Sequence, residues 1–241
     1  MLNARDLGGY AGLGGRETRW GAVVRSGNLA MLTATGRQAL VDYGVRSIVD
    51  LRLSEEVARH PNPFAEPDAH GVGYANLSFI DPGAPAPPSV STLAEDYQGM
   101  LDRFGQAVAA VMTAIANAPE GGVLVHCAAG KDRTGLVAAL LLGLAGVAPE
   151  TIAADYALTA DCLRPRDQEW LENGPGERAD REAWLRWAEP TAEVMLEVLD
   201  HLAARYGGVE GYLLQAGVAP GDLDRLRSRL LDPPGGMVRP S

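Results

Sequence analysis

Short apolar runs alternate with stretches of helical periodicity in the first half of the chain. Four of these runs have the length and composition of β-strands: 22–26, 46–52, 71–77 and 121–127. Between them, the spacing of apolar residues predicts helices over 33–43, 54–59 and 91–117. Strands that alternate with helices predict an α/β fold, with a largely parallel central sheet flanked by helices.

The second half of the chain has a different pattern and contains no convincing strand. Residues 149–231 predict four or five helices, interrupted at glycine and proline. The apolar stretch 135–147 is shorter than the roughly 20 residues of a membrane span, so it predicts a helix buried on all sides instead. A proline-rich segment, 81–89, follows the third strand and is expected to be a lid or an acid-bearing loop.

Composition and charge narrow the classes of function. The chain has 241 residues, 46% hydrophobic and 22% charged, which is typical of a globular domain with a full core. Its net charge of −10 disfavours nucleic acid as a partner, because phosphate backbones attract basic surfaces. No signal-peptide pattern opens the sequence, so we expect a cytoplasmic protein without an integral membrane segment.

The candidate chemistry lies in "VLVHCAAGKDRTG", where Cys127 follows the fourth predicted strand. A helix is expected to open at Thr134 or Gly135, directly after this loop. Ligands of open α/β sheets bind at this edge, where backbone N–H groups and the helix dipole attract anions. The same field favours a thiolate over a thiol. The only other cysteine is Cys162, so a disulfide framework is not expected.

The rest of the loop has the residue types of a phosphate site. Ala128, Ala129 and Gly130 are small enough for a phosphate to approach the backbone closely. Lys131 adds positive charge, and the planar fork of Arg133 suits two oxygens of a phosphoryl group. Together these residues and Asp132 are the predicted phosphate-binding set.

The run "HCAAGKDRTG" resembles the HCxxGKDRTG signature of the bacterial atypical tyrosine and lipid phosphatases, which are cysteine-dependent phosphatases. Further stretches resemble the same family: "NARDLGGY", in which Ala4 replaces the usual Phe, "VVRSGNLAMLT", "SIVDLRLSEEV", "IAADYALTA" and "YGGVEGYLLQAGV". The resemblance implies one catalytic domain over 1–232 and a tail over 233–241. It also implies a phosphatase without cofactor or metal that acts on phosphotyrosine in proteins, with phosphoserine, phosphothreonine or phosphoinositides as alternatives.

The resemblance assigns Cys127 as the nucleophile and Arg133 as the residue that holds the phosphoryl oxygens. Thr134 is expected to donate its hydroxyl to the cysteine sulfur, to cap the following helix, or both. His126 is expected either to orient the loop through its ring hydrogen bonds or simply to pack at the end of the strand. The general acid is Asp132, inside the loop, or Asp81, whose alternative role is an ordinary turn residue.

Several further residues are expected to support the loop. Arg5 and Asp6 are predicted to form a buried pair that braces it, and Asp50 and Arg52 are predicted to do likewise. Lys131 is either a second cation beside a phosphoinositide headgroup or a solvated loop lysine.

The role of Cys162 is open: it is either a protective disulfide partner of Cys127 or a small hydrophobic residue. Three alternatives remain for the whole loop: a structural turn, a rhodanese-like sulfurtransferase, and a catalytically silent phosphate-binding module. The presence of cysteine, arginine and aspartate together disfavours the silent module, because a binder has no need of the thiol.

Overall fold

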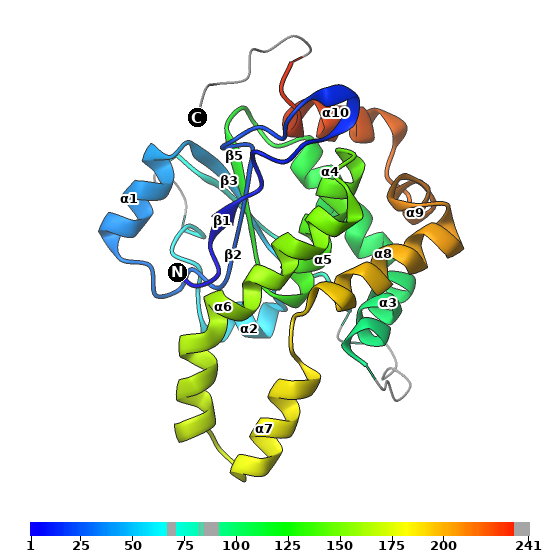
Figure 1. Ribbon diagram of the computed structural model, residues 1–241. Helices are drawn as coiled ribbons and strands as arrows, with labels where there is room; N and C mark the ends of the chain where they lie inside the picture. Colours follow the sequence, from blue (N-terminus) through cyan, green and yellow to red (C-terminus); the bar gives the residue numbers. More distant parts are fainter. Residues whose placement is uncertain (67–70, 82, 84–91, 234–241) are drawn as a thin grey trace.

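Figure 1 shows a central sheet with helices on both faces in the computed structural model, which describes residues 1–66, 71–81, 83 and 92–233. The strands are β1 (Arg5–Asp6), β2 (Val23–Ser26), β3 (Val45–Asp50), β4 (Gly73–Asn76) and β5 (Gly122–His126). Their order is β1-β2-β5-β3-β4. Strands β2, β5, β3 and β4 are parallel to one another, and β1 is antiparallel to β2. The predicted α/β class is confirmed; the two-residue β1 is too short to leave a pattern in the sequence.

Alternation along the strands divides the core into two parts. Val24, Ile48 and Leu124 face a smaller core that includes Leu40 of α1 (Ala34–Asp42). The neighbouring residues Val49 and Val125 face the larger core. The short helix α2 (Ser54–Arg59) follows β3, as predicted.

The larger core lies between the sheet and seven helices. They are α3 (Leu93–Arg103), α4 (Gly105–Ala116), α5 (Asp132–Leu144), α6 (Pro149–Asn173), α8 (Ala192–Tyr206), α9 (Val209–Ala216) and α10 (Pro220–Leu230). The single helix expected over 91–117 is instead two, because the backbone of the buried Phe104 leaves the helical conformation (φ −112°, ψ 28°). Helix α5 begins at Asp132, two residues before the earlier of the expected starts.

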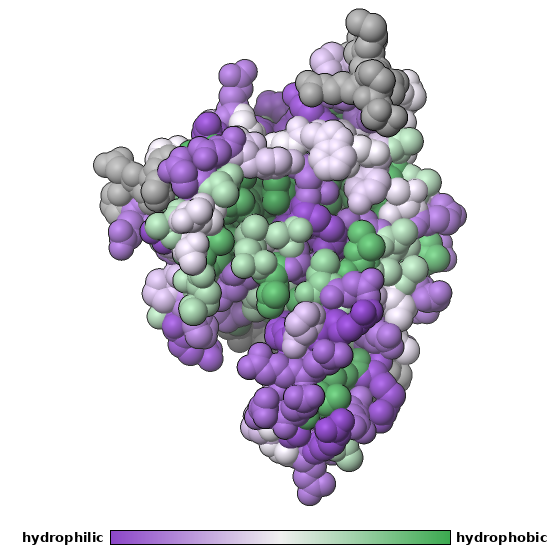
Figure 2. All heavy atoms as spheres, turned by 60° about the vertical axis from the view of Figure 1, so that its left-hand side comes forward, coloured by the Kyte–Doolittle hydropathy of each residue, from purple (hydrophilic) through white to green (hydrophobic). Residues whose placement is uncertain are grey.

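Helix α6 and helix α7 (Arg178–Trp187) form a hairpin that projects from the body (Figure 1). Arg181 stabilises its turn by donating to the carbonyl groups of Leu171, Gly174 and Gly176. Figure 2 shows that the projecting part has a mostly hydrophilic surface. Among the described residues, no helix is long and apolar enough to cross a membrane. Most of the predicted loop 81–89 and residues 234–241 of the predicted tail lie outside the described residues.

Candidate active site

The Cys127 loop (residues 127–133) lies at the carboxyl edge of the sheet. His126, the last residue of β5, pairs in register with Ser26 of β2 and Asp50 of β3, so these three strands end level. Cys127 comes next and is 1% exposed. Because α5 starts at Asp132, its positive N-terminal end points at the loop.

The carbonyl groups of residues 127–131 in this loop are hydrogen-bonded by donors from outside it. His126 Nδ1 donates to the Cys127 carbonyl (3.1 Å), and the Asn28 N–H donates to that of Ala128 (2.9 Å). Asn3 Nδ2 donates to the carbonyls of Ala129 (3.3 Å) and Gly130 (2.8 Å). Arg25 Nη2 also donates to Gly130 (2.9 Å), and the Gly135 N–H donates to Lys131 (2.8 Å). In each peptide the N–H points opposite to the C=O, so fixing the carbonyls outward turns the N–H groups inward. Within the described part of the chain, the N–H groups of residues 128–131 have no partner, as an anion nest requires.

Gly130 is required by the backbone rather than by a ligand alone. Its φ is +69°, a conformation that side chains disfavour. A Cβ at this position would lie 2.5 Å from the carbonyl carbon and oxygen of Ser26. The close neighbour that explains this glycine is therefore strand β2, whereas the sequence suggested only the phosphate.

Arg133 is held by Glu56, the third residue of α2. Nη1 and Nη2 donate to the two Glu56 carboxylate oxygens at 2.6 and 2.9 Å, and Nη1 also reaches the Leu51 carbonyl at 3.3 Å. These bonds use the outer edge of the guanidinium, which carries Nη1 and Nη2. The side edge carries the Nε–H and the second N–H of Nη2, and neither has a partner within the described residues. These two parallel donors match two oxygens of a phosphoryl group.

The charges of this pair reinforce each other. Burial opposes the charge on Arg133, but its bonds to Glu56 and the attraction of Cys127 raise its pKa above the ordinary value. Burial likewise opposes the charge on Glu56, but Arg133 and the Leu53 N–H lower its pKa below the ordinary value. Both groups are therefore charged at neutral pH.

Asp132, the first residue of α5, is oriented by a chain of hydroxyl groups. The Tyr97 hydroxyl donates to its carboxylate at 2.6 Å and lies 2.7 Å from the Tyr156 hydroxyl, which donates in turn. The side chain of Asp132 is 36% exposed, so the carboxylate is fixed yet open to solvent. Asp81 is exposed and accepts from the Gly83 N–H at 2.8 Å, which is the geometry of a turn-forming aspartate.

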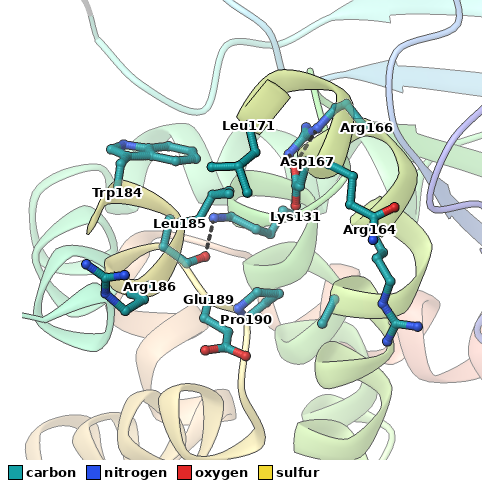
Figure 3. Close-up of a pocket in the computed structure, with 13 residues that line it drawn as sticks. Lys131, Arg164, Arg166, Asp167, Leu171, Trp184, Leu185, Arg186, Glu189 and Pro190 are labelled. Atoms are coloured by element: carbon teal, nitrogen blue, oxygen red, sulfur yellow. Dashed lines mark hydrogen bonds and ion pairs between the residues drawn. The ribbon is translucent and has the colours of Figure 1, made fainter. Parts of the chain in front are cut away.

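Lys131 is buried, with 7% exposed, so it is not a solvated loop lysine. Its ammonium donates to the Ala188 carbonyl at 2.8 Å, lies 3.3 Å from the Asp132 carboxylate, and stands 5.6 Å from the centre of the Trp184 ring. Figure 3 shows Lys131 in a pocket of about 340 Å³ among residues of α6 and α7, including Arg164 and Arg166. The loop is thus connected to the projecting hairpin through this lysine.

His126 is a neutral ring with an assigned tautomer. The side-chain oxygen of Asn62, Oδ1, accepts from the Phe64 N–H, so the side-chain nitrogen Nδ2 faces His126 Nε2 at 2.9 Å and donates to it. Nδ1 therefore carries the proton and donates to the Cys127 carbonyl. Burial lowers the pKa of His126, in agreement with a neutral ring. Of the two expectations for this residue, the geometry favours orientation of the loop.

Thr134 lies within α5, whose N-cap position is Lys131, so the expected capping role is wrong. Its buried hydroxyl has no hydrogen-bond partner among the described residues, and the predicted bond to the cysteine sulfur is absent there. Cys162 lies half-buried on α6, and both cysteines are free thiols.

The expected pair of Arg5 and Asp6 is also wrong. Adjacent residues of a strand point to opposite faces, so the two side chains cannot meet across β1. Asp6 instead accepts from the N–H groups of Gly8 and Gly21. Arg5 reaches across to Asp155 of α6 at 2.8 Å.

Asp50 and Arg52 form the expected buried pair, with Nη2 and a carboxylate oxygen 2.6 Å apart. Arg52 also donates to the side-chain oxygen of Asn28, whose N–H binds the Ala128 carbonyl. The pair therefore supports the Cys127 loop indirectly: Arg52 holds Asn28, and Asn28 binds the loop.

Sequence reasoning missed several residues of this site. Glu56, Arg25, Asp155 and Asn3 all lie in the stretches that carried the family resemblance, so their positions were visible although their roles were not. Tyr97 lies in no such stretch, and no signal in the sequence points to it. Among the described residues, no group of three or more His, Cys, Asp or Glu side chains is placed to hold a metal ion.

The chain is similar to known proteins over most of its length. A family model described as "Tyrosine phosphatase family" matches residues 1–232. A tyrosine-protein phosphatase of Nostoc commune is 36% identical over 219 residues, which cover 87% of this chain and 74% of the relative. The triple specificity protein phosphatase PtpB of Mycobacterium tuberculosis is 31% identical, over 95% of this chain and 96% of the relative.

Proposed function

The chain belongs to the tyrosine phosphatase family, and from the geometry of its Cys127 loop we propose that it hydrolyses phosphate monoesters through a cysteinyl-phosphate intermediate. The observation that carries the proposal is the orientation of the loop. Its carbonyl groups are bound from outside, its N–H groups face inward, and the free side edge of Arg133 adds two further donors. Such a cradle fits the three outer oxygens of a phosphoryl group above the Cys127 sulfur.

In the first step, the Cys127 thiolate attacks phosphorus, and an S–P bond forms as the ester P–O bond breaks. Negative charge stays on the three outer oxygens, which the loop N–H groups and Arg133 bind. Arg133 can turn its side edge to these oxygens because Glu56 holds its outer edge. The leaving oxygen needs a proton, which we assign to Asp132.

In the second step, Asp132 takes a proton from water, which attacks phosphorus and releases the thiolate and inorganic phosphate. The Tyr97 hydroxyl supports this assignment because it fixes the direction of the carboxylate. Asp81 is exposed and occupied in a turn, so nothing in its contacts supports the role of acid. The buried hydroxyl of Thr134, which has no partner in the described part of the chain, is available to the sulfur when it leaves.

For the substrate, we propose phosphotyrosine in proteins as the principal class, in line with relatives named tyrosine-protein phosphatases. The name of the mycobacterial relative, a triple specificity phosphatase, favours a wider range that includes phosphoserine, phosphothreonine or phosphoinositides. The pocket beside the loop is lined by Lys131, Arg164, Arg166 and Arg186 but also by Asp167 and Glu189, so cations outnumber anions in it, which suits substrates with more than one phosphate.

The proposal is tested with Cys127→Ser and, as the matched control, Cys162→Ser. We expect Cys127→Ser to lose all but about a thousandth of the turnover of p-nitrophenyl phosphate while still binding phosphate, and Cys162→Ser to stay active. Activity of the wild type should also survive EDTA. Turnover by Cys127→Ser near the wild-type rate would refute the mechanism, and binding without turnover by the wild type would favour a silent phosphate-binding module.

A further inference from the structure

A fully buried arginine lies beneath the Cys127 loop and has no role in the steps above. Arg25 is 1% exposed and lies in β2, beside the central strand. Its Nη2 donates to the Gly130 carbonyl at 2.9 Å, and its Nη1 donates to the Asp155 carboxylate at 2.7 Å. Its Nε, also buried, has no partner among the described residues.

The surroundings of Arg25 hold more positive than negative charge. Arg5 stands directly opposite Arg25 in the β1–β2 pair, and both donate to the same carboxylate, that of Asp155. Like charges opposite each other on neighbouring strands are destabilising. One arginine would be enough to neutralise Asp155, so a structural role alone does not explain two.

The other cations at the loop each have their own carboxylate. Within the described part of the chain, Arg133 pairs with Glu56, Arg52 with Asp50, and Lys131 with Asp132, while His126 is neutral. The trio of Arg5, Arg25 and Asp155 therefore carries one uncompensated positive charge. The tyrosines around the loop and Asp155 are Tyr97, Tyr156 and Tyr10, which donates to Asp155 at 3.0 Å; they are also neutral, because burial raises the pKa of each.

We propose that Arg25 is a positioning residue with two tasks: it is the buried counter-charge of the Cys127 thiolate, and it fixes the Gly130 carbonyl so that the Lys131 N–H faces the substrate. A thiolate makes the local charge balance neutral, which explains why the second arginine is present. Burial and then Arg5 lower the pKa of Arg25 below its ordinary value, while Asp155 and, less strongly, Cys127 act to raise it. The inference rests on the proposed role of Cys127 as nucleophile.

The test measures ionisation of the thiol directly, by the ultraviolet absorbance of the thiolate as pH is raised. All variants are made in a Cys162→Ser background, so that Cys127 is the only thiol, and the same protein with Cys127→Ser is subtracted. The measurement needs no substrate and no access of a reagent to the buried sulfur. It therefore separates this inference from the proposed function, which the turnover assay tests alone.

Two variants should move the titration in opposite directions. Arg25→Met removes the counter-charge with little change in volume, so half-ionisation should move upward by roughly one pH unit or more. Asp155→Asn removes a negative charge from the same trio, so half-ionisation should move downward. A structural role predicts instead that both variants disturb the loop in the same direction, because both break the same ion pair.

Arg25→Lys separates the two tasks. It keeps the charge, so the titration should stay near that of the parent, but it loses the planar fork that binds Gly130 and Asp155 together. We therefore expect kcat/KM to fall at least tenfold with an unchanged titration.

Arg5→Met is the control, since Arg5 also pairs with Asp155 but makes no hydrogen bond of its own to the loop carbonyls; it donates to Asn3, whose amide binds the Ala129 and Gly130 carbonyls. Its upward shift should be smaller than that of Arg25→Met. If Arg25→Met does not fold, Arg25→Lys and Asp155→Asn still decide the question. The inference is overturned if Asp155→Asn leaves the titration unchanged or moves it upward, or if Arg25→Met folds and titrates like the parent.

Discussion

Replacing Glu56 by Gln tests how far activity depends on the orientation of Arg133. The glutamine side chain has the same shape, and its oxygen can still accept from the Leu53 N–H, so the start of α2 is preserved. It presents only one acceptor to Arg133, where the glutamate presents two at 2.6 and 2.9 Å. The variant therefore removes one charge-assisted bond and the opposing charge, and it places the amide NH2 group, a donor, opposite an N–H of Arg133 Nη2.

The size of the effect follows from the contacts. A hydrogen bond to a charged group contributes about 1.5–3 kcal/mol, and we take the lower part of this range because the Glu56 side chain is 25% exposed. If Arg133 must be in place to bind the phosphoryl oxygens, a loss of about 1.5 kcal/mol lowers kcat/KM by roughly tenfold. The assay is hydrolysis of p-nitrophenyl phosphate, together with the melting temperature of each protein.

Glu55→Gln is the control for this prediction. Glu55 is exposed and lies in the same first turn of α2. Its substitution removes the same charge without a change in the contacts of Arg133. We expect its kcat/KM to stay within about twofold of the wild type, as is usual for an exposed charge. A folded Glu56→Gln protein with kcat/KM equal to that of Glu55→Gln would refute the reasoning.

Three further predictions concern the acid, the substrate range and the stability. Asp132→Asn should slow hydrolysis of aryl phosphates with poor leaving groups by about 10²–10⁴-fold and good ones much less, whereas Asp81→Asn should show no such difference; the reverse result would transfer the acid role to Asp81. Lys131→Ala should lower kcat/KM more on a phosphoinositide than on p-nitrophenyl phosphate, and equal losses would contradict a role in substrate choice. Burial lowers the pKa of His126 below its ordinary value of 6.5. As the pH drops below 6.5, this residue is protonated in the unfolded chain before it is protonated in the folded one, so the free energy of unfolding falls. Urea unfolding at pH 7 and pH 5 should therefore show a flatter pH dependence for His126→Gln than for the wild type, by up to about 1.4 kcal/mol per pH unit.

Much of the fold could be predicted because the strands and helices leave clear periodic patterns. Helix α2 has the predicted bounds, and four strands lie where apolar runs were found. The break between α3 and α4 was not predicted, although Gly105 directly follows Phe104 and is a signal for a helix boundary; the apolar spacing on both sides reads as one continuous helix. Strand β1 exists only because its partner β2 is present, so its two residues carry no signal of their own.

The site was predictable where chemistry is concentrated in one stretch, as in the Cys127 loop. Contacts between distant stretches were not predictable, because the sequence shows which residues are charged but not which of them meet. Arg5 was paired with its neighbour Asp6, whereas the structure pairs it with Asp155, 150 residues away. The same limit applies to Arg25 and Asn3, whose partners in the loop are more than 100 residues distant.

These long separations determine when the site can form during synthesis. The bond from Arg25 to Asp155 joins residues that are 130 positions apart, so its formation must wait until this part of α6 has left the ribosome. Contacts of such long range also form slowly, because the loop-closure entropy is lost before they stabilise the chain. A nascent chain that has released only the Cys127 loop therefore has its thiol but lacks the Asp155 carboxylate that holds Arg25 and the Tyr156 hydroxyl that binds Tyr97. During synthesis, phosphatase activity should therefore appear only after these distant parts of the chain have come together.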